Sequence, residues 1–243
     1  MDSAGEAFAA AWRLLISFDG ELLSVVGLSL RVSMSAVALA SVVALPLGAL
    51  LALYRFPGRR LVVVLLDALM GLPPVVVGLV VYLVFSRSGP MGGLGWLFTP
   101  RVMILAQALL VCPIIAALTR QAIEQEWEVL GEQLRSLGLS PVRAVPTLLW
   151  EGRYALLTTL LAGFGRAIAE VGAVLIVGGN IAHVTRVMTT TIALETSKGD
   201  LALALGLGIV LILIAVAVNA LAHAVRHAEE RIARVAPPRT NRA

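Results

Sequence analysis

Long apolar segments alternate with short charged ones along most of the chain. Five of the apolar segments are long enough, or nearly so, to cross a bilayer, which takes about 20 helical residues. They cover residues 22–53, 61–85, 102–119, 155–178 and 201–222. Backbone polar groups in lipid must be paired within the protein, so apolar segments of this length favour helices. The pattern predicts an all-α integral membrane protein with five transmembrane helices.

Two of these segments contain features that lengthen or break a helix. Residues 22–53 exceed the thickness of one bilayer, so their helix must tilt or begin in the interface, and Pro46 with Gly48 permits a bend near its end. Residues 61–85 contain Pro73 and Pro74, which remove two backbone donors. We therefore expect the second helix to be broken or kinked at mid-membrane, beside a protein-lined cavity.

The two ends of the chain differ from the apolar core of residues 22–222. Residues 1–20 place Trp12 and Ile16 at helical spacing but include Arg13 and Asp19, which predicts a short helix lying in the membrane interface. Residues 223–243 form the tail, which is predicted to be charged and helical over residues 223–235 and disordered after them, where Pro237 and Pro238 stand. No internal repeat is visible, so residues 1–243 are predicted to form a single transmembrane domain.

Composition supports this class and excludes several others. Hydrophobic residues make up 59% of the 243 positions and charged residues 14%, which is outside the range of soluble domains. The one lysine, Lys198, stands outside any P-loop pattern, so the chain has no ATPase site of its own. Neither a nucleophile with its base nor a metal-binding spacing of histidines is present. The sequence predicts no catalytic residue, no metal site and no bound cofactor.

The distribution of basic residues predicts the orientation. Loops on one side of the predicted membrane and the tail carry 12 arginines, whereas the other side carries five basic residues. Cytoplasmic loops are the ones enriched in arginine and lysine. The N-terminus is therefore predicted outside, and the C-terminus and the segment 120–153 in the cytosol.

The segment 120–153 is the longest charged stretch between two apolar spans. Its second part, residues 131–151, reads GEQLRSLGLSPVRAVPTLLWE. Gly138 permits a turn, and Ser140 followed by Pro141 is a usual helix start. Glu132 and its charged neighbours exclude this part from lipid, whereas Leu134 can pack on a neighbour. We predict a cytosolic helix–turn–helix that presses on a partner; an ordinary amphipathic loop is the alternative.

Arg166 and Glu170 lie four residues apart in the fourth apolar segment, hence on one face of a helix. Each is costly in hydrocarbon, so they must face a partner helix, a subunit interface or water. One interpretation is an internal ion pair that locks the helix. The other is a gate or pathway pair beside small residues such as Gly172, which permit close helix approach.

Residues 178–200 form an unusually polar external segment. Asn180, Thr189 and Thr190 lie here with Arg186. The segment either meets a delivering protein or lines an entrance, or it is a solvated loop with capping hydroxyls. Arg31, in the first span, either extends to the outer interface or attracts an anion.

Other polar residues in the spans have simpler interpretations. Asp67 is expected to meet Arg59 or Arg60, and Gln107 and Asn219 to form hydrogen bonds between helices.

Several blocks together resemble the molybdate/tungstate branch of type I ABC-importer permeases, in the order of that family. The blocks are SLRVS at 29–33, PLG at 46–48, GLPPVVVGL at 71–79, SRSGP at 86–90 and GFGRAIAEVGA at 163–173. Glu132 followed by Gly138 resembles the EAA loop, the coupling helix that sits in a groove of the ATPase subunit. The blocks GGNI at 178–181, TR at 185–186 and TTTI at 189–192 are similar to the tungstate-type permeases.

This resemblance implies a type I permease fold in a bacterial plasma (inner) membrane. It implies a homodimer with the pathway at its interface, two cytosolic ATPase subunits that hold ATP and Mg, an external oxyanion-binding protein and no nucleic acid. The substrate implied is tungstate, with molybdate open. The implied coupling residues are Glu132, Leu134, Gly138 and Leu139; the pathway or gate residues are Arg166, Glu170, Gly172, Asn180, Thr189 and Thr190; Arg31 and Arg186 are the anion-attracting candidates.

Two other functions remain open from the residues alone. An autonomous secondary transporter or channel is one, although such transporters are often built from inverted repeats, and none is visible. A scaffold or membrane-enzyme subunit without transport activity is the other, and the missing catalytic cluster disfavours it.

Overall fold

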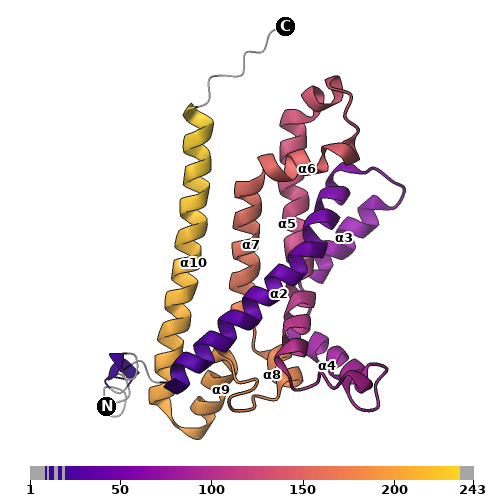
Figure 1. Cartoon of the computed structure of the whole chain (residues 1–243). Helices are drawn as coiled ribbons and strands as arrows, with labels where there is room; N and C mark the ends of the chain where they lie inside the picture. The colour runs from indigo at the N-terminus through magenta and orange to yellow at the C-terminus, as the bar shows by residue number, and fades with distance from the viewer. Residues whose placement is uncertain (1–8, 10, 14–15, 18–19, 236–243) are drawn as a thin grey trace.

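The computed structural model describes residues 9, 11–13, 16–17 and 20–235, and these are helical apart from short connections (Figure 1). The helices are α2 (Gly20–Leu53), α3 (Arg59–Leu69), α4 (Pro74–Phe85), the 3-10 turn η1 (Gly92–Leu94), α5 (Pro100–Ser136), α6 (Pro141–Glu151), α7 (Arg153–Ile168), α8 (Gly172–Gly178), α9 (Met188–Lys198) and α10 (Leu201–Val235). Most of the interfacial helix predicted for residues 1–20 lies outside the described residues, as does the end of the tail.

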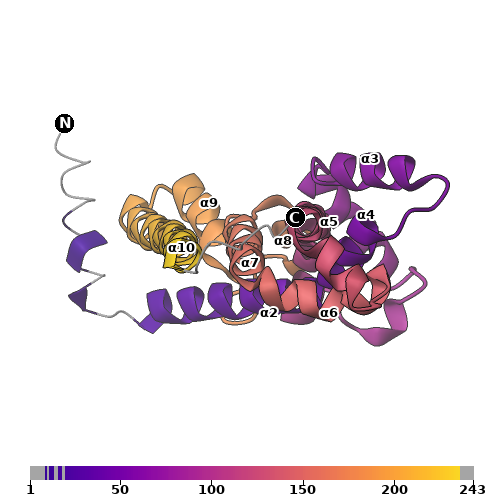
Figure 2. The same cartoon turned by 90° about the horizontal axis from the view of Figure 1, so that it is seen from above.

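Three single helices in the described part are long and apolar enough to cross a membrane: α2, α5 and α10. Two bent pairs, α3 with α4 and α7 with α8, bring the number to at most five by length and composition. The membrane class is confirmed, and the five crossings stay a prediction. Figure 2 shows α10, α7 and α5 in a row beside α2.

The predicted break at the two prolines is confirmed. Helix α3 ends before Pro73, and α4 begins at Pro74 after a bend of 97°. Because Pro74 has no N–H, it suits the first position of a helix and cannot continue the preceding one.

A second break was not predicted. The fourth apolar segment was expected to be one helix, but α7 ends at Ile168 and α8 begins at Gly172, with a bend of 59°. Arg166 is therefore helical, whereas Glu170 lies in the connection between the two helices. Glycines at 163, 165 and 172 lower the helix propensity of this stretch, which is the local signal that predicted close packing but not a break.

The third apolar segment also differs from its prediction. It was expected to end at residue 119, and α5 instead continues through the charged residues to Ser136. Between Arg120 and Ser136 stand mostly strong helix formers, such as Ala, Gln, Glu and Leu, so nothing stops the helix where it leaves the apolar segment.

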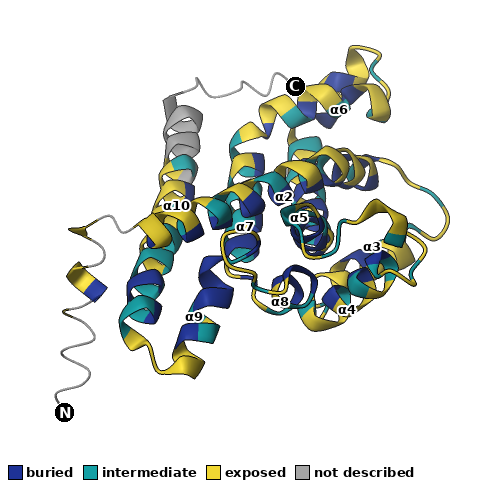
Figure 3. Cartoon of the chain, turned by 60° about the horizontal axis from the view of Figure 1, so that its bottom comes forward, coloured by how far each residue is buried: buried dark blue, intermediate teal, exposed yellow. Residues whose placement is uncertain are grey.

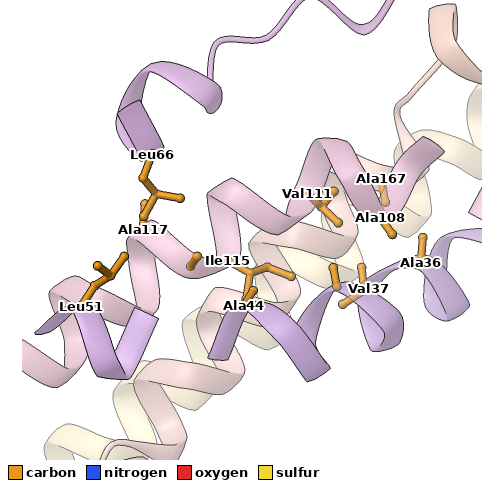
Figure 4. Close-up of a cluster of buried hydrophobic side chains, with 12 residues drawn as sticks. Ala36, Val37, Ala44, Leu51, Leu66, Ala108, Val111, Ile115, Ala117 and Ala167 are labelled. Atoms are coloured by element: carbon orange, nitrogen blue, oxygen red, sulfur yellow. The ribbon is translucent and has the colours of Figure 1, made fainter. Parts of the chain in front are cut away.

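The centre of the molecule is the seam between α2 and α5. A cluster of buried apolar side chains fills it, as Figure 4 shows; its small members include Ala36, Ala40, Ala44, Ala108, Ala116 and Ala117. Small residues let two helix backbones approach closely, which is how helices associate inside lipid, where apolar burial alone gives no preference.

Large apolar side chains are exposed on several helices. Figure 3 shows exposed positions on α3, α4 and α10. Among them are the large side chains Leu61, Val64, Leu79, Ile212 and Leu213. An apolar surface this extensive marks contact with a membrane or with another protein.

Gly48 tests the importance of the seam. A Cβ atom at this position would clash with the Ala116 carbonyl oxygen of α5 and lie 2.8 Å from the Thr119 Cβ. We expect Gly48→Ala to lower the free energy of unfolding by about 1–3 kcal/mol, because α2 and α5 must move apart. The measurement is thermal unfolding in detergent micelles.

The matched control is Gly27→Ala in the same helix, where no neighbouring atom lies within 4 Å of the new Cβ. This control should leave the stability unchanged or raise it by up to about 1 kcal/mol through helix propensity. Equal effects of the two substitutions would show that the seam does not require glycine.

Candidate coupling and translocation sites

The end of α5, the turn at residues 137–140 and α6 form a hairpin, called here the coupling hairpin. Gly138 has a φ of +77°, and the Leu139 N–H donates to the Leu134 carbonyl at 3.0 Å, which is a glycine-terminated helix end. Ser140 then precedes Pro141 at the start of α6. The predicted helix–turn–helix is confirmed, with the turn at the predicted glycine.

The hairpin has an inner and an outer side. Leu134 is buried and Leu139 is partly buried in a cluster that joins α5 and α6 to Ala49 and Leu53 of α2. Glu132 and Gly138 are exposed, and so is Leu137, at 77%. Of the four predicted coupling residues, the two leucines therefore attach the hairpin to the helices, and Glu132 and Gly138 face outward.

An ion-pair network lies at the same end of the molecule. Glu124 of α5 binds both Arg59 and Arg120, and Arg120 also approaches Asp67 at 3.9 Å. The expected pairing of Asp67 with Arg59 or Arg60 is wrong. Eight residues of helix separate Arg59 from Asp67, a rise of about 12 Å, whereas Arg120 lies on the helix packed beside α3.

Arg166 and Glu170 form the predicted ion pair, at 2.6 Å between Nη1 and Oε2. The Glu170 side chain is only 3% exposed, and that of Arg166 is 35% exposed. The second Glu170 oxygen accepts the Ala173 N–H at 3.1 Å, in the first turn of α8. Glu170 thus joins both sides of the break between α7 and α8, while the Arg166 side chain remains partly accessible.

The polar external segment is folded onto this break. The Thr189 hydroxyl donates to the Glu170 carbonyl at 2.7 Å, and the Thr190 hydroxyl lies 2.9 Å from the Asn180 side-chain oxygen. Thr189, Thr190 and Thr191 are buried in α9, so this part of the segment is not a solvated loop. Residues 181–184 and 196–200 are exposed, and the Thr190 hydroxyl accepts the Val187 N–H at the start of α9, as a capping hydroxyl does.

Gly172 stands where α8 meets α4. A Cβ atom on it would lie 2.9 Å from Val75 Cγ2, and one on Gly78 of α4 would lie 2.8 Å from the Ala173 Cα. The two bent pairs are therefore in close backbone contact through small residues at the same level as the Glu170 network.

Ser29 is a site residue for which the sequence predicted no role. Its hydroxyl oxygen accepts the Met188 N–H at 2.8 Å, at the start of α9, and its proton goes to the Val25 carbonyl at 2.7 Å. A hydroxyl among apolar residues of a span was the only signal in the sequence. It attaches α9 to α2 in the same way that Thr189 attaches α9 to the break.

The predictions for the remaining polar candidates have different outcomes. Gln107 donates to the Ala167 carbonyl of α7 at 3.0 Å, so its predicted interhelical bond is confirmed. Asn219 instead donates to Ala215 in its own helix, and the interhelical prediction for it is wrong. Arg186 lies 3.4 Å from Glu21, and Arg31 is exposed with no ion pair among the residues described.

Comparison with known proteins identifies the family. Residues 44–231 match the family described as the binding-protein-dependent transport system inner membrane component. The chain belongs to this family. Members of this class are permease subunits of ABC transporters, which have no ATPase site of their own and reside as multi-pass proteins in the inner membrane with ATPase and substrate-binding partners.

Three relatives show how far the similarity extends. The permease is 40% identical to the tungstate uptake system permease protein TupB of Peptoclostridium acidaminophilum, over 93% of this chain and 99% of the relative. It is 37% identical to TupB of Campylobacter jejuni, over 83% and 84%. It is 40% identical to a probable anion ABC transporter permease protein of Haloferax volcanii, over 82% and 88%.

Glu170 and Asp67 both pair with an arginine, and the stability lost on neutralising each carboxylate can be compared. Glu170→Gln leaves the partly buried Arg166 without a counter-charge, so we expect a loss of about 2 kcal/mol in unfolding free energy, below the value for a fully buried pair. Asp67→Asn should cost less than about 0.5 kcal/mol, because Asp67 is 46% exposed and 3.9 Å from its partner. Thermal unfolding of both variants measures the difference, and equal mild effects would contradict it.

Proposed function

We propose that this permease is the transmembrane subunit of an ATP-driven importer that moves tungstate into the cytoplasm, with molybdate as the second candidate substrate. The similarity to two tungstate uptake permeases supports the substrate. The observation that carries the mechanism is the coupling hairpin, which has an outward-facing turn and a buried attachment to α2 and α5.

The hairpin is suited to transmit force from an ATPase. Its outer side presents Glu132, Leu137 and Gly138 to a partner, and its inner side is packed on α2 through Leu134 and Leu148. Motion of a docked ATPase subunit is therefore passed to the α2–α5 seam as a rigid displacement rather than absorbed in a loop. Rigid-body movement of this kind is the basis of alternating access.

The proposed pathway lies beside the Arg166 pair in a homodimer. Arg166 is the charged side chain at the α7–α8 break, and Glu170 neutralises it. An ion that carries two negative charges must be attracted without being held, because a conduit that binds too tightly stalls release. A neutralised arginine whose side chain is partly accessible meets both needs, so selectivity rests mainly with the external binding protein.

Orientation in the membrane follows from the same assembly. The coupling hairpin and the C-terminal end of α10 lie at one end of the molecule, and α4, α8 and α9 lie at the other (Figure 1). ATPase subunits are cytosolic, so the hairpin end faces the cytosol and the N-terminus lies outside. The arginine bias of the loops supports the same orientation.

Gly138 tests the coupling function. Asp at a φ of +77° strains the turn and adds a charge to the docking side, so Gly138→Asp should abolish tungstate uptake and ATPase stimulation while membrane insertion persists. The measurements are uptake by reconstituted complex and the amount of ATPase that copurifies with the permease.

Gly199→Asp is the matched control for this substitution. Gly199 has a φ of +85°, no atom within 4 Å of a Cβ, and a place at the opposite end of the molecule. Full uptake in this control together with loss in Gly138→Asp supports coupling through the hairpin. Full uptake in both variants would contradict it.

Substrate and assembly require a separate experiment. Proteoliposomes that contain permease, ATPase and binding protein should take up tungstate only with ATP, with two permease chains per complex by mass. Inhibition of tungstate uptake by an excess of molybdate tests whether molybdate is a second substrate, and an excess of sulfate is the control anion. Uptake by the permease alone, without ATPase, would instead establish an autonomous transporter.

A further inference from the structure

A cavity of about 520 Å³ lies between the end of α2, the last part of α5 and the start of α6. It is separate from the Arg166 network and lies on the side of the coupling hairpin that faces α2. The residues of its wall that matter here are Tyr54, Arg55, Trp127, Arg135, Ser140 and Val142. No role in coupling or translocation accounts for this combination of cations and aromatic rings.

Two pairs of arginines near this end differ in their partners. Arg59 and Arg120 share the Glu124 carboxylate. Arg55 and Arg135, which line the cavity, make no ion pair with any residue in the described ranges. Arg135 places its guanidinium carbon 5.1 Å from the centroid of the Trp127 ring instead. Two cations without a counter-charge on one cavity wall favour an anionic ligand, and guanidinium groups suit phosphate oxygens best.

The depth of the cavity indicates where that anion comes from. Helix α2 is apolar up to Leu53, and the apolar part of α3 starts at Leu61, so the cavity lies where the membrane helices end. Tryptophan and tyrosine are enriched at this level of a bilayer, where their rings meet the lipid headgroups. Basic residues at the same level attract anionic lipids of the cytoplasmic leaflet.

The start of α6 adds to the positive wall. Ser140 precedes the helix, and its side chain makes no capping hydrogen bond. The N-terminal end of a helix carries a partial positive charge that favours an anion. The Ser140 hydroxyl therefore remains available as a donor beside the two arginines.

We propose that this cavity binds a phosphate-type oxyanion presented by the headgroup of an anionic phospholipid. Arg55 and Arg135 hold the phosphate, Ser140 donates to it, and Trp127 packs beside the glycerol region. The lipid ties the coupling hairpin to the membrane surface next to α2. This proposal rests on the cytosolic orientation given above and is independent of the transported substrate.

Trp127 serves as the reporter. In the full chain with Trp12, Trp96 and Trp150 replaced by Phe, the fluorescence of Trp127 is recorded in phosphatidylcholine vesicles that contain phosphatidylglycerol brominated high on its acyl chains. We expect quenching by brominated phosphatidylglycerol at lower mole fraction than by brominated phosphatidylcholine. Arg55→Gln and Arg135→Gln should each reduce this preference about fivefold.

Arg87→Gln is the matched control, since Arg87 is an exposed arginine outside the cavity and lies in the connection after α4. It should keep the preference. Equal quenching by both lipids, or a preference that survives the Arg55 and Arg135 substitutions, overturns the proposal.

Two further measurements test whether the cavity is filled by a lipid, by a free oxyanion or by the partner protein. Inorganic phosphate in the buffer should not relieve the quenching; relief would assign the cavity to a free oxyanion and overturn the lipid assignment. Assembly with the ATPase subunits should leave the quenching in place, and its loss would mean that the partner protein fills the cavity. The quenching measurements do not depend on uptake, whereas the transport proposal is tested by uptake. Failure of one proposal can therefore be distinguished from failure of the other.

Discussion

Every break in a membrane helix exposes backbone N–H and C=O groups that lipid cannot satisfy. The structure depends on how two such breaks are closed. At the first, Pro73 and Pro74 remove donors, and the Pro73 carbonyl accepts the N–H groups of Val76 and Val77. At the second, the Glu170 carboxylate accepts an N–H of α8, and the hydroxyl of Thr189 and the amide of Gln107 satisfy carbonyls of the connection and of α7. The second break therefore needs its own Glu170 and side chains from two other helices, α5 and α9, to complete it.

This requirement explains why the threonines at the start of α9 are buried rather than solvated. Thr189 of α9 donates a hydrogen bond to the break, and the Met188 N–H at the start of α9 donates one to Ser29 of α2. Each hydrogen bond has its full worth only if the others hold the helices in place, because a buried donor left unpaired costs more than a formed bond gains. The network couples α2, α7, α8 and α9 at one end of the molecule, beside the partly accessible side chain of Arg166.

The other end is organised by charge and by apolar packing together. Glu124 joins α5 to the start of α3 through Arg59, and Leu134 and Leu148 attach the coupling hairpin to α2. The α2–α5 seam connects this end to the Glu170 network through a run of alanines. A displacement of the hairpin thus reaches the proposed pathway through closely packed helices, which deform little. Arg55 and Arg135, which make no ion pair in the described part of the chain, line the cavity beside this connection, where we propose that a lipid phosphate binds.

The sequence by itself determined the membrane class, the break at Pro73, the turn at Gly138 and the Arg166–Glu170 pair. Each of these depends on local chemistry: apolar length, a missing N–H, a positive φ or a four-residue spacing. Only the tertiary structure decided that Glu170 lies beyond a helix end, that Asp67 meets Arg120, that Ser29 holds α9 and that Arg55 and Arg135 share a cavity. These outcomes depend on which helices pack side by side, and residues brought together from distant parts of the chain leave no periodic signal along it.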